Sequence, residues 1–287
     1  MSSVYSPLRY PGGKNCIFPF ISTILSENGI AGCKYVEPYA GGAGLALRLL
    51  FEEYVESIVI NDLDPFVHCF WRVCTQQNER LIQWVAETPV TVKAWKRCKE
   101  ILRHKEEMTD FELATAFFFL NRTNVSGVLN GGIIGGLDQL GKYKIDARYN
   151  KPELLRRIEK IGRYKSRIEV SRLDGVKLLS RYTRSGAGNI FIYIDPPYYE
   201  KGSNLYMNYY NDQDHEKLSM KIRKLKKPWV LSYDNNEFIV NLYNNFERRA
   251  YRLQHSTSNR IGNEVVVFSP VLSFQKSIEK LNDAVAI

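Results

Sequence analysis

The sequence has no long apolar run, only five scattered cysteines and only four dispersed histidines. No apolar stretch approaches the roughly 20 residues that span a bilayer, and the N-terminal MSSVYSPLRYPGGK lacks the apolar core of a secretory signal. The cysteines show no CxxC spacing, and no histidine stands at metal-ligand spacing. We therefore expect a cytoplasmic protein with reduced thiols, no membrane segment and no bound metal.

Charge, in contrast, is concentrated in one part of the chain. The protein has 287 residues, 44% of them hydrophobic, and a net charge of +9. The segment 142–184 holds 14 Lys and Arg against 5 Asp and Glu, whereas the remainder holds 26 of each. Such a run is often only the solvated face of a helix. Because tyrosines and glycines are interleaved with it, we interpret it as the binding surface for a polyanion.

Short β-rich runs alternate with helical patterns along much of the chain. The expected strands are 34–39, 57–62, 167–172, 189–195 and 228–234, and the expected helices are 43–54, 64–86 and 213–226. This alternation predicts an α/β fold with a mostly parallel sheet, in which 189–195 is an interior strand. The segments 247–255 and 264–269 predict a terminal hairpin, which reverses the last strand.

The segment 70–165 interrupts the alternation. It contains an expected helix at 109–122, a glycine-rich loop at 124–144 and another helix at 152–164. A loop of about 20 residues inside a compact domain is more often functional than a simple connector. We predict that 70–165 is an insert in a discontinuous domain formed by 1–69 and 166–274, and that 275–287 is a tail.

The sequence Asp195-Pro196-Pro197-Tyr198 follows the apolar run NIFIYI. The carboxyl end of an interior strand is where α/β proteins bind ligands. The two prolines stiffen the turn, so the Asp195 carboxylate and the Pro196 carbonyl are placed to accept hydrogen bonds from an amine. Tyr198 offers a flat face for a base, and for this reason we expect its ring, not its hydroxyl, to matter.

Two further segments have the features of a cofactor site. In YVEPYAGGAG a strand ends at Glu37, and a turn containing Gly41 leads into a helix. Glycines allow a ligand close to the backbone at a helix N-terminus. Asp62 ends the second strand, where an acid can bind ribose hydroxyls. The turn PLRYPGGK near the N-terminus carries little information alone.

Taken together, PLRYPGGK, EPYAGGAG, NDLDP, FLNRTN, KYKIDARYNKP, DPPYY, DHEKL and LSYDNN resemble the Dam-like, or D12, class of DNA adenine-N6 methyltransferases. The resemblance implies a Rossmann-like methyltransferase sheet with a helical target-recognition insert, and S-adenosylmethionine as cofactor. Three catalytic residues would hold the target adenine: Asp195, Pro196 and Tyr198. The implied donor-site residues are Tyr10, Lys14, Glu37, Gly41, Asp62, Asp174 and Asp195.

The resemblance also implies that duplex DNA is the partner and that the protein is associated with the nucleoid. The expected DNA contacts are Arg122, Asn124, Ser126, Asn130, Lys142, Lys144, Arg148 and Lys151. Members that recognise GATC carry an arginine where this chain has Asn130, so GATC is not assigned as the target. The chain also has Ala43 where many members have glycine, and alanine fits there if its φ angle is negative.

Direct methyl transfer to a flipped adenine needs alignment of the reactants more than acid–base strength. Related RNA or protein methyltransferases usually show NPPY, and cytosine-N4 enzymes usually show SPPY. An RNA adenine methyltransferase and a catalytically weak DNA-binding module stay open as alternatives. A Rossmann dehydrogenase would need GxGxxG, which is absent. We expect a monomer in solution, with a cognate restriction endonuclease as a possible partner.

Overall fold

The computed structural model describes residues 4–10, 12–184, 188–200, 210–254 and 261–287. The chain divides into two compact units. Unit 1 comprises 1–4, 12–63 and 171–287, and unit 2 comprises 5–11 and 64–170. The insert expected from the sequence spans 70–165, and the main segment of unit 2 spans 64–170. Pro11 of the PGGK turn lies outside the described residues.

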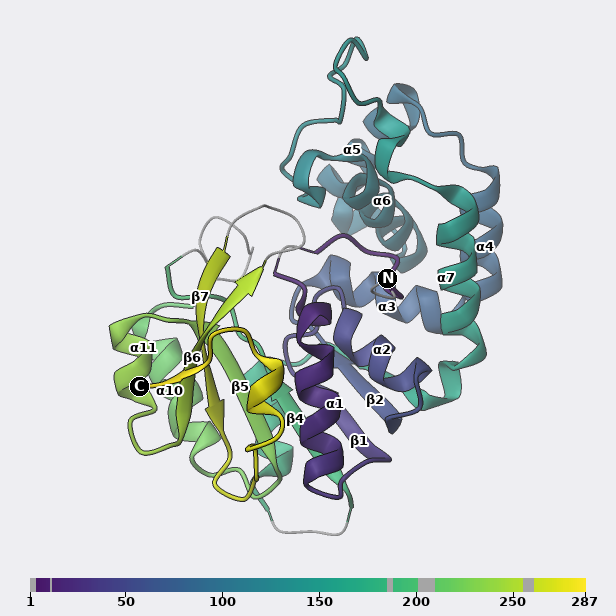
Figure 1. The fold of residues 1–287 in the computed structure, drawn as a ribbon. Coiled ribbons are helices and arrows are strands. Elements are labelled where there is room, and N and C mark those ends of the chain that lie inside the picture. The colour runs from purple at the N-terminus through teal and green to yellow at the C-terminus, as the bar shows by residue number, and fades with distance from the viewer. Residues whose placement is uncertain (1–3, 11, 185–187, 201–209, 255–260) are drawn as a thin grey trace. The chain divides into compact units, whose positions relative to one another are not determined.

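A sheet forms the centre of unit 1, and the boundary between the units, after residue 170, falls within its edge strand (Figure 1). Its strands within the described residues are β1 (Cys33–Glu37), β2 (Val55–Asn61), β3 (Ile168–Ser171), β4 (Ile190–Ile194), β5 (Trp229–Asp234), β6 (Arg248–Gln254), β7 (Ile261–Phe268) and β8 (Val285–Ala286). They follow the order β3-β2-β1-β4-β5-β7-β6-β8. The pairs β1–β2, β1–β4 and β4–β5 are parallel, whereas β7 is antiparallel to both β5 and β6.

This topology confirms the predicted α/β fold, with a mostly parallel sheet and an antiparallel end. The strand β4 lies between β1 and β5, and its residues Phe191, Ile192 and Ile194 are fully buried. The apolar composition of this strand follows from its position, because a parallel strand covered on both faces has no side exposed to water. The strand β8 pairs with β6, within the segment that we expected to be a plain tail.

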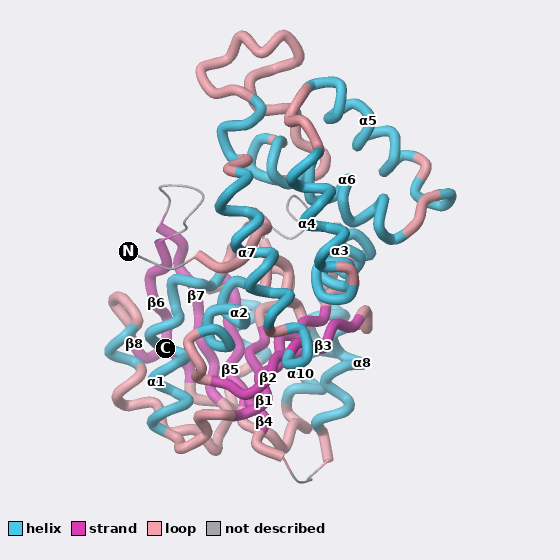
Figure 2. Tube along the Cα trace, turned by 90° about the vertical axis from the view of Figure 1, so that its right-hand side faces the viewer, coloured by secondary structure: helices cyan, strands magenta, loops and turns pink. Residues whose placement is uncertain are grey.

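Helices cover both faces of the sheet (Figures 1 and 2). The helices α1 (Phe18–Glu27) and α2 (Gly44–Phe51) lie on one face, and α8 (Gly175–Leu179), α10 (Asp212–Ile222) and α11 (Glu237–Leu242) lie on the other. On the second face, Leu178 of α8 and Leu218 of α10 pack in one core with Ile192 of β4. The carboxyl ends of the parallel strands lie along one side of the sheet, and the polar residues that end these strands are therefore close together.

Unit 2 is helical. It contains α3 (Pro65–Gln76), α4 (Asn78–Glu87), α5 (Val92–Arg103), α6 (Asp110–Thr123) and α7 (Lys151–Arg163). The expected helix 64–86 is broken at Gln77, where the backbone leaves the helical region. The helix α6 begins with a capping box between Thr109 and Glu112. Its aromatic residues form the core with α3: Phe70 stacks on Phe118 with ring centroids 5.4 Å apart.

No helix among the described residues is both long and apolar enough to cross a membrane.

Candidate active site

Four acidic residues stand at the carboxyl ends of neighbouring strands in unit 1. Glu37 ends β1, Asp62 follows β2, Asp195 follows β4 and Asp234 ends β5. Because these strands run parallel, the four residues lie at one edge of the sheet, where ligands bind in open α/β folds.

Asp195 is held by two side chains. Lys14 Nζ lies 3.0 Å from its Oδ1, and Ser232 Oγ of β5 donates to the same oxygen at 2.8 Å. Ser232 in turn lies 2.7 Å from the hydroxyl of Tyr193. The Asp195 side chain keeps 21% of its surface exposed. Loss of hydration raises the pKa of Asp195, and the charge of Glu264 adds to the rise while that of Lys14 opposes it.

Lys14 is buried, with 3% of its side chain exposed. It belongs to the short 3-10 helix η1 (Lys14–Ile17). Its Nζ donates to the hydroxyl of Tyr198 at 2.6 Å and lies 3.4 Å from Oε1 of Glu264. Burial alone would lower the pKa of Lys14, but the carboxylates of Asp195 and Glu264 outweigh it, so the pKa is raised well above its ordinary value. The expected donor-site lysine is thus an ion-pair partner of Asp195.

Tyr198 is 7% exposed, and its hydroxyl donates to Oε1 of Glu264. The hydroxyl therefore bridges Lys14 and Glu264, and the Lys14 ammonium also lies 4.9 Å from the centroid of the ring. The hydroxyl thus has structural partners, which the expectation for Tyr198, based on the flat face of its ring, did not include. Pro196 is buried, so the turn after Asp195 is enclosed as well as stiffened.

Asp234 holds the backbone that follows the DPPY segment. Its Oδ1 accepts from the Tyr199 N–H and its Oδ2 from the Glu200 N–H, both at 2.9 Å. Sequence reasoning noted the LSYDNN segment but gave Asp234 no role. Its position at the end of an expected strand could have identified it as a site residue, because acids at the ends of neighbouring parallel strands lie close together.

The glycine-rich turn after β1 is tied to the end of β2. The Gly41 N–H donates to Oδ2 of Asp62 at 2.8 Å, and Gly41 has a φ of 46°. Ala43 also has a positive φ, 45°, in the left-handed region before α2. The condition under which alanine was expected to fit, a negative φ, is therefore not met, and an L-residue adopts this conformation at a cost.

Glu37 is a buried acid behind this turn. It accepts a hydrogen bond from the Tyr35 hydroxyl at 2.9 Å and another from the Ala46 N–H. Burial, aided by the neighbouring charge of Asp195, raises the pKa of Glu37 to about 8. A half-buried Asp62 and a left-handed glycine turn fit a cationic nucleoside, because the carboxylate offers negative charge and hydroxyl acceptors and the turn allows close backbone approach.

Two of the expected donor-site residues, Asp174 and Tyr10, lie on other elements than the turn between β1 and α2. Asp174 is the N-cap of α8 and accepts from the Lys177 N–H at 3.0 Å. Tyr10 belongs to unit 2 and is half-buried. The donor-binding roles of Tyr10 and Asp174 stay predictions.

The loop after α6 is closed by backbone hydrogen bonds. The Val125 N–H donates to the Gly132 carbonyl and the Ile134 N–H to the Thr123 carbonyl, both at 2.9 Å. Between these pairs the loop exposes Ser126, with a φ of 57°, and Asn130. The expected base-reading residues Ser126 and Asn130 are therefore on the surface of unit 2.

Asn124 is not on that surface. It is fully buried, its Oδ1 accepts from the indole of Trp95 at 2.7 Å, and its Nδ2 donates to the Val128 carbonyl at 2.8 Å. This corrects the prediction that Asn124 contacts DNA bases, because its amide is bonded at both ends inside the fold and has no exposed surface with which to reach a base edge.

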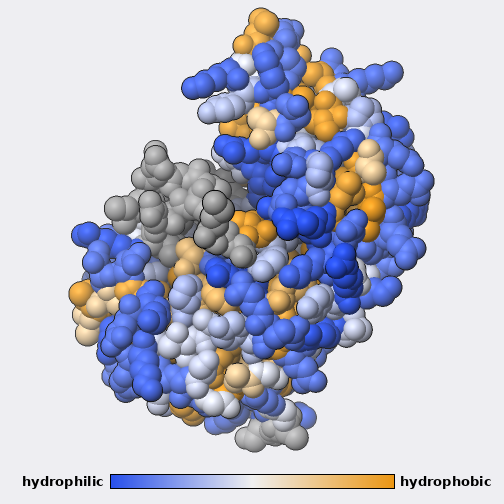
Figure 3. Space-filling model, turned by 45° about the vertical axis from the view of Figure 1, so that its right-hand side comes forward, coloured by the Kyte–Doolittle hydropathy of each residue, from blue (hydrophilic) through white to orange (hydrophobic). Residues whose placement is uncertain are grey.

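The three predicted phosphate-binding lysines differ in their surroundings. Lys142 is exposed. Lys144 Nζ donates to the Gln139 carbonyl at 2.6 Å, and Lys151 Nζ donates to the Ala86 carbonyl at 2.8 Å. Lys144 and Lys151 thus have structural bonds in addition to any role with DNA. The face of unit 2 seen in Figure 3 is mostly hydrophilic, with apolar side chains among the polar ones.

Four arginines of unit 2 influence one another electrostatically: Arg9, Arg122, Arg148 and Arg157. Burial, together with the positive charges of Arg9, Arg157 and Arg148, lowers the pKa of Arg122 to about 9. The Nε of Arg122 is buried and has no hydrogen-bond partner among the described residues. Such a cluster of positive charge favours an anion.

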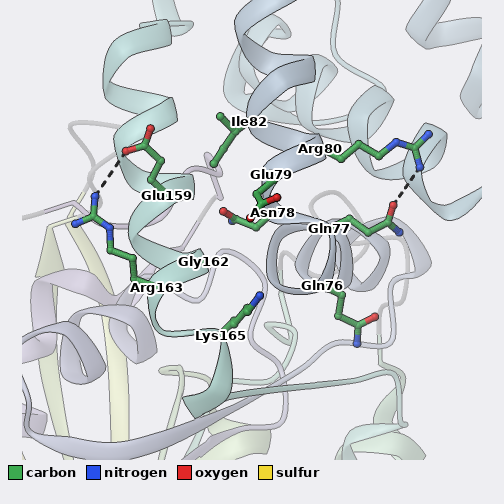
Figure 4. Close-up of a pocket in the computed structure, with 10 residues that line it drawn as sticks. All are labelled: Gln76, Gln77, Asn78, Glu79, Arg80, Ile82, Glu159, Gly162, Arg163 and Lys165. Carbon is green, nitrogen blue, oxygen red and sulfur yellow. Dashed lines mark hydrogen bonds and ion pairs between the residues drawn. The ribbon is translucent and has the colours of Figure 1, made fainter.

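A separate open pocket of unit 2 lies between α4 and α7 (Figure 4). On one side Arg163 lies 3.8 Å from Glu159, and on the other Arg80 donates to Gln77 at 3.1 Å. The pocket contains none of the residues that the sequence predicted for a site.

Comparison with known proteins identifies the family of the chain. The sequence pattern of the family described as D12 class N6 adenine-specific DNA methyltransferase matches residues 10–257. A relative from Methanocaldococcus jannaschii, the type II methyltransferase M.MjaIII, is 24% identical over 256 residues, which cover 82% of this chain and 85% of the relative.

Proposed function

Because the chain belongs to the D12 class N6 adenine-specific DNA methyltransferase family, we propose that it transfers a methyl group from S-adenosylmethionine to N6 of an adenine flipped out of duplex DNA. The observation that carries the proposal is the position of Asp195. It stands at the end of an interior strand, before Pro196-Pro197, with Lys14 and Ser232 fixing one carboxylate oxygen.

The acceptors for the amine follow from these contacts. In the described part of the chain, Lys14 and Ser232 both contact Oδ1 of Asp195. We therefore assign Oδ2 and the Pro196 carbonyl to the two N–H groups of the adenine amine. Hydrogen bonds to these acceptors pull the nitrogen lone pair out of conjugation and stabilise the positive charge that develops there. The amine then loses a proton, and Asp195, with its raised pKa, is the acceptor we assign.

Tyr198 is assigned to the flipped base. Base extrusion costs a few kcal/mol, and stacking on an aromatic ring offsets part of that cost. The hydroxyl bonds to Lys14 and Glu264 support this assignment, because they fix the orientation of the ring before the base arrives.

The donor is assigned to the turn between β1 and α2. The cofactor supplies an activated methyl group on a sulfonium. Asp62 would accept hydrogen bonds from its ribose hydroxyls, and the turn containing Gly41 would pack against its methionine part, with Glu37 buried nearby. Tyr10 and Asp174 remain candidates for the same site. For Lys14, the contacts favour a role at Asp195 over direct donor binding.

Unit 2 is assigned to DNA. Arg122 and Arg148, with Lys142, Lys144 and Lys151, would contact phosphates, which position a protein on DNA without specifying sequence. Ser126 and Asn130 would contact base edges. We further propose that the protein acts as a monomer and is associated with the nucleoid. The name of the relative as a type II methyltransferase makes a cognate endonuclease a reasonable partner to seek.

Incubation of the purified protein with isotopically labelled S-adenosylmethionine and unmethylated plasmid DNA tests the proposal. Mass spectrometry of the nucleosides should detect labelled N6-methyladenine, and Asp195→Asn should give none while still binding the donor. Label in N4-methylcytosine, or label only when RNA replaces DNA, would contradict the proposed substrate. Tight DNA binding without any transfer would favour a DNA-binding module.

A further inference from the structure

Glu264 is a buried acid outside every segment that carries the family resemblance. It lies on β7, opposite Asp234 of β5 in the antiparallel register, and only 2% of its side chain is exposed. The next four residues of β7, Val265 to Phe268, are fully or almost fully buried. An acid in such surroundings is costly unless its oxygens are bonded and its charge is balanced.

Both oxygens of Glu264 are in fact used. Its Oε2 accepts from the hydroxyl of Tyr251 on β6 at 2.7 Å. Its Oε1 accepts from the hydroxyl of Tyr198 and lies 3.4 Å from Lys14 Nζ. These contacts join the last hairpin of the sheet to the DPPY segment and to the N-terminal PGGK turn, which are far apart in sequence.

We propose that Glu264 is a positioning residue of the methyl-transfer site, acting through Tyr198 and Lys14. The inference rests on the proposed function, because it assigns Glu264 to the same reaction. Glu264 anchors the hydroxyl of Tyr198 and therefore sets the plane of the ring that stacks on the adenine. It also shares Lys14 with Asp195, so the ammonium is not drawn entirely to the carboxylate that must accept from the amine.

The number of charges around Lys14 supports this role of Glu264. Two carboxylates, Asp195 and Glu264, surround one ammonium, that of Lys14. Removal of the Glu264 charge leaves Lys14 with Asp195 alone, which strengthens that ion pair. Asp195 then becomes a weaker acceptor for the adenine amine, and the Tyr198 hydroxyl donates to a neutral group, which is a weaker acceptor than a carboxylate.

The test is a double-mutant cycle between Glu264→Gln and Tyr198→Phe. Glutamine keeps the volume of the side chain but not its charge. Glu264→Gln should lower kcat about 10- to 100-fold, as small misplacements of reacting groups do, while KM for donor and for plasmid DNA changes less than about threefold. In the Tyr198→Phe background the same substitution should cost less, because the hydroxyl that Glu264 holds is already absent and only the route through Lys14 remains. Glu247→Gln, on the exposed part of the chain before β6, is the matched control.

The wild-type protein is assayed first, so the two proposals fail separately. No methyl transfer by the wild type contradicts the proposed function. An active wild type with an equally active Glu264→Gln, or with losses that multiply independently in the double mutant, overturns the role of Glu264. Should Glu264→Gln fail to fold, Tyr251→Phe removes one of the donors to Glu264. It should lower kcat several-fold at unchanged KM, and an unchanged kcat overturns the inference.

Discussion

The ammonium of Lys14 lies 3.0 Å from Oδ1 of Asp195 and joins the N-terminal turn to the end of β4. Both groups are withdrawn from water to a large extent, and their pairing compensates for the lost hydration. The same contact leaves the other oxygen of Asp195 for a substrate. The geometry of the site therefore depends on a buried lysine that the sequence pattern suggested for a different task.

Lys14→Met should destabilise the protein strongly, by about 3–5 kcal/mol at neutral pH, because it leaves two buried carboxylates without their cation. The pKa of Lys14 is raised in the folded protein, so its stabilisation is present below the pKa of a free lysine. It is lost only as the pH rises through the folded value, at strongly alkaline pH. Urea unfolding measures the change. Lys224→Met, at an exposed position after α10, should change stability little.

Ala43→Gly should stabilise the protein by about 1 kcal/mol, because glycine adopts the left-handed conformation found at this position without the steric cost that alanine has. Ala46→Gly is the matched control. It lies within α2, where glycine should destabilise by about 1 kcal/mol. Thermal unfolding distinguishes the two, and a lower Tm for Ala43→Gly would contradict the assigned backbone.

Glu37 should make stability depend on pH. Burial, aided by the charge of Asp195, raises its pKa from 4.5 to about 8, while Tyr35 opposes the rise. The folded protein therefore holds a proton that the unfolded chain has released. The corresponding stability is fully present below about pH 4.5 and is lost as the pH rises toward about 8, by roughly 1.4 kcal/mol per pH unit.

Glu37→Gln should remove this component. The difference in unfolding free energy between wild type and variant, measured by denaturant titration from pH 5 to pH 8, should shift steadily in favour of the variant. A difference that does not change with pH would show that Glu37 is ionised throughout.

Lys142→Ala and Arg148→Ala should each weaken binding to all duplexes alike. Log affinity falls linearly with log salt, with a slope near −0.9 per phosphate neutralised, so each substitution should flatten the slope by about 1 if each residue meets one phosphate. Lys144 is less suitable, since it also holds the loop through the Gln139 carbonyl. Lys105→Ala, at an exposed position elsewhere in unit 2, is the control. Unchanged slopes for both variants would indicate that the basic run is only a solvated surface.

Asn130→Ala and Asn124→Ala should have opposite effects. Asn130 is exposed on the loop after α6, so its replacement should change the methylated sequence and leave stability intact. Asn124 is buried and bonded to Trp95 and Val128, so its replacement should cost about 1–3 kcal/mol. Sequencing of the methylated sites together with urea unfolding tests the pair. A stable Asn124→Ala with an altered target would restore Asn124 as a base-reading residue.

Most of the sheet could be predicted because periodicity and composition determine it locally. The strand β4, with Ile192 and Ile194, is apolar throughout, and the acids at strand ends mark the ligand edge whatever the detailed packing. The break of the long helix at Gln77 and the strand β8 were not predictable in this way, since both depend on neighbours distant in sequence.

The polar network around Asp195 could not be predicted for the same reason. Glu264 lies in a strand whose sequence shows no site motif. Its partners Tyr198 and Lys14 are distant in sequence, and only the fold brings them to it. The grouping of residues 5–11 with the helical unit depends on Arg9 and Asn121, which exchange hydrogen bonds of 2.8 and 2.7 Å. A side chain that bonds a distant backbone leaves no periodic trace in the sequence.

The most direct test of the central claim is long-read sequencing of DNA from cells that lack adenine methylation and express either the wild type or Asp195→Asn. We predict N6-methyladenine in one recurring sequence context with the wild type, and none with the variant. Unmodified adenines in both samples, or the same methylation in both, would contradict the account.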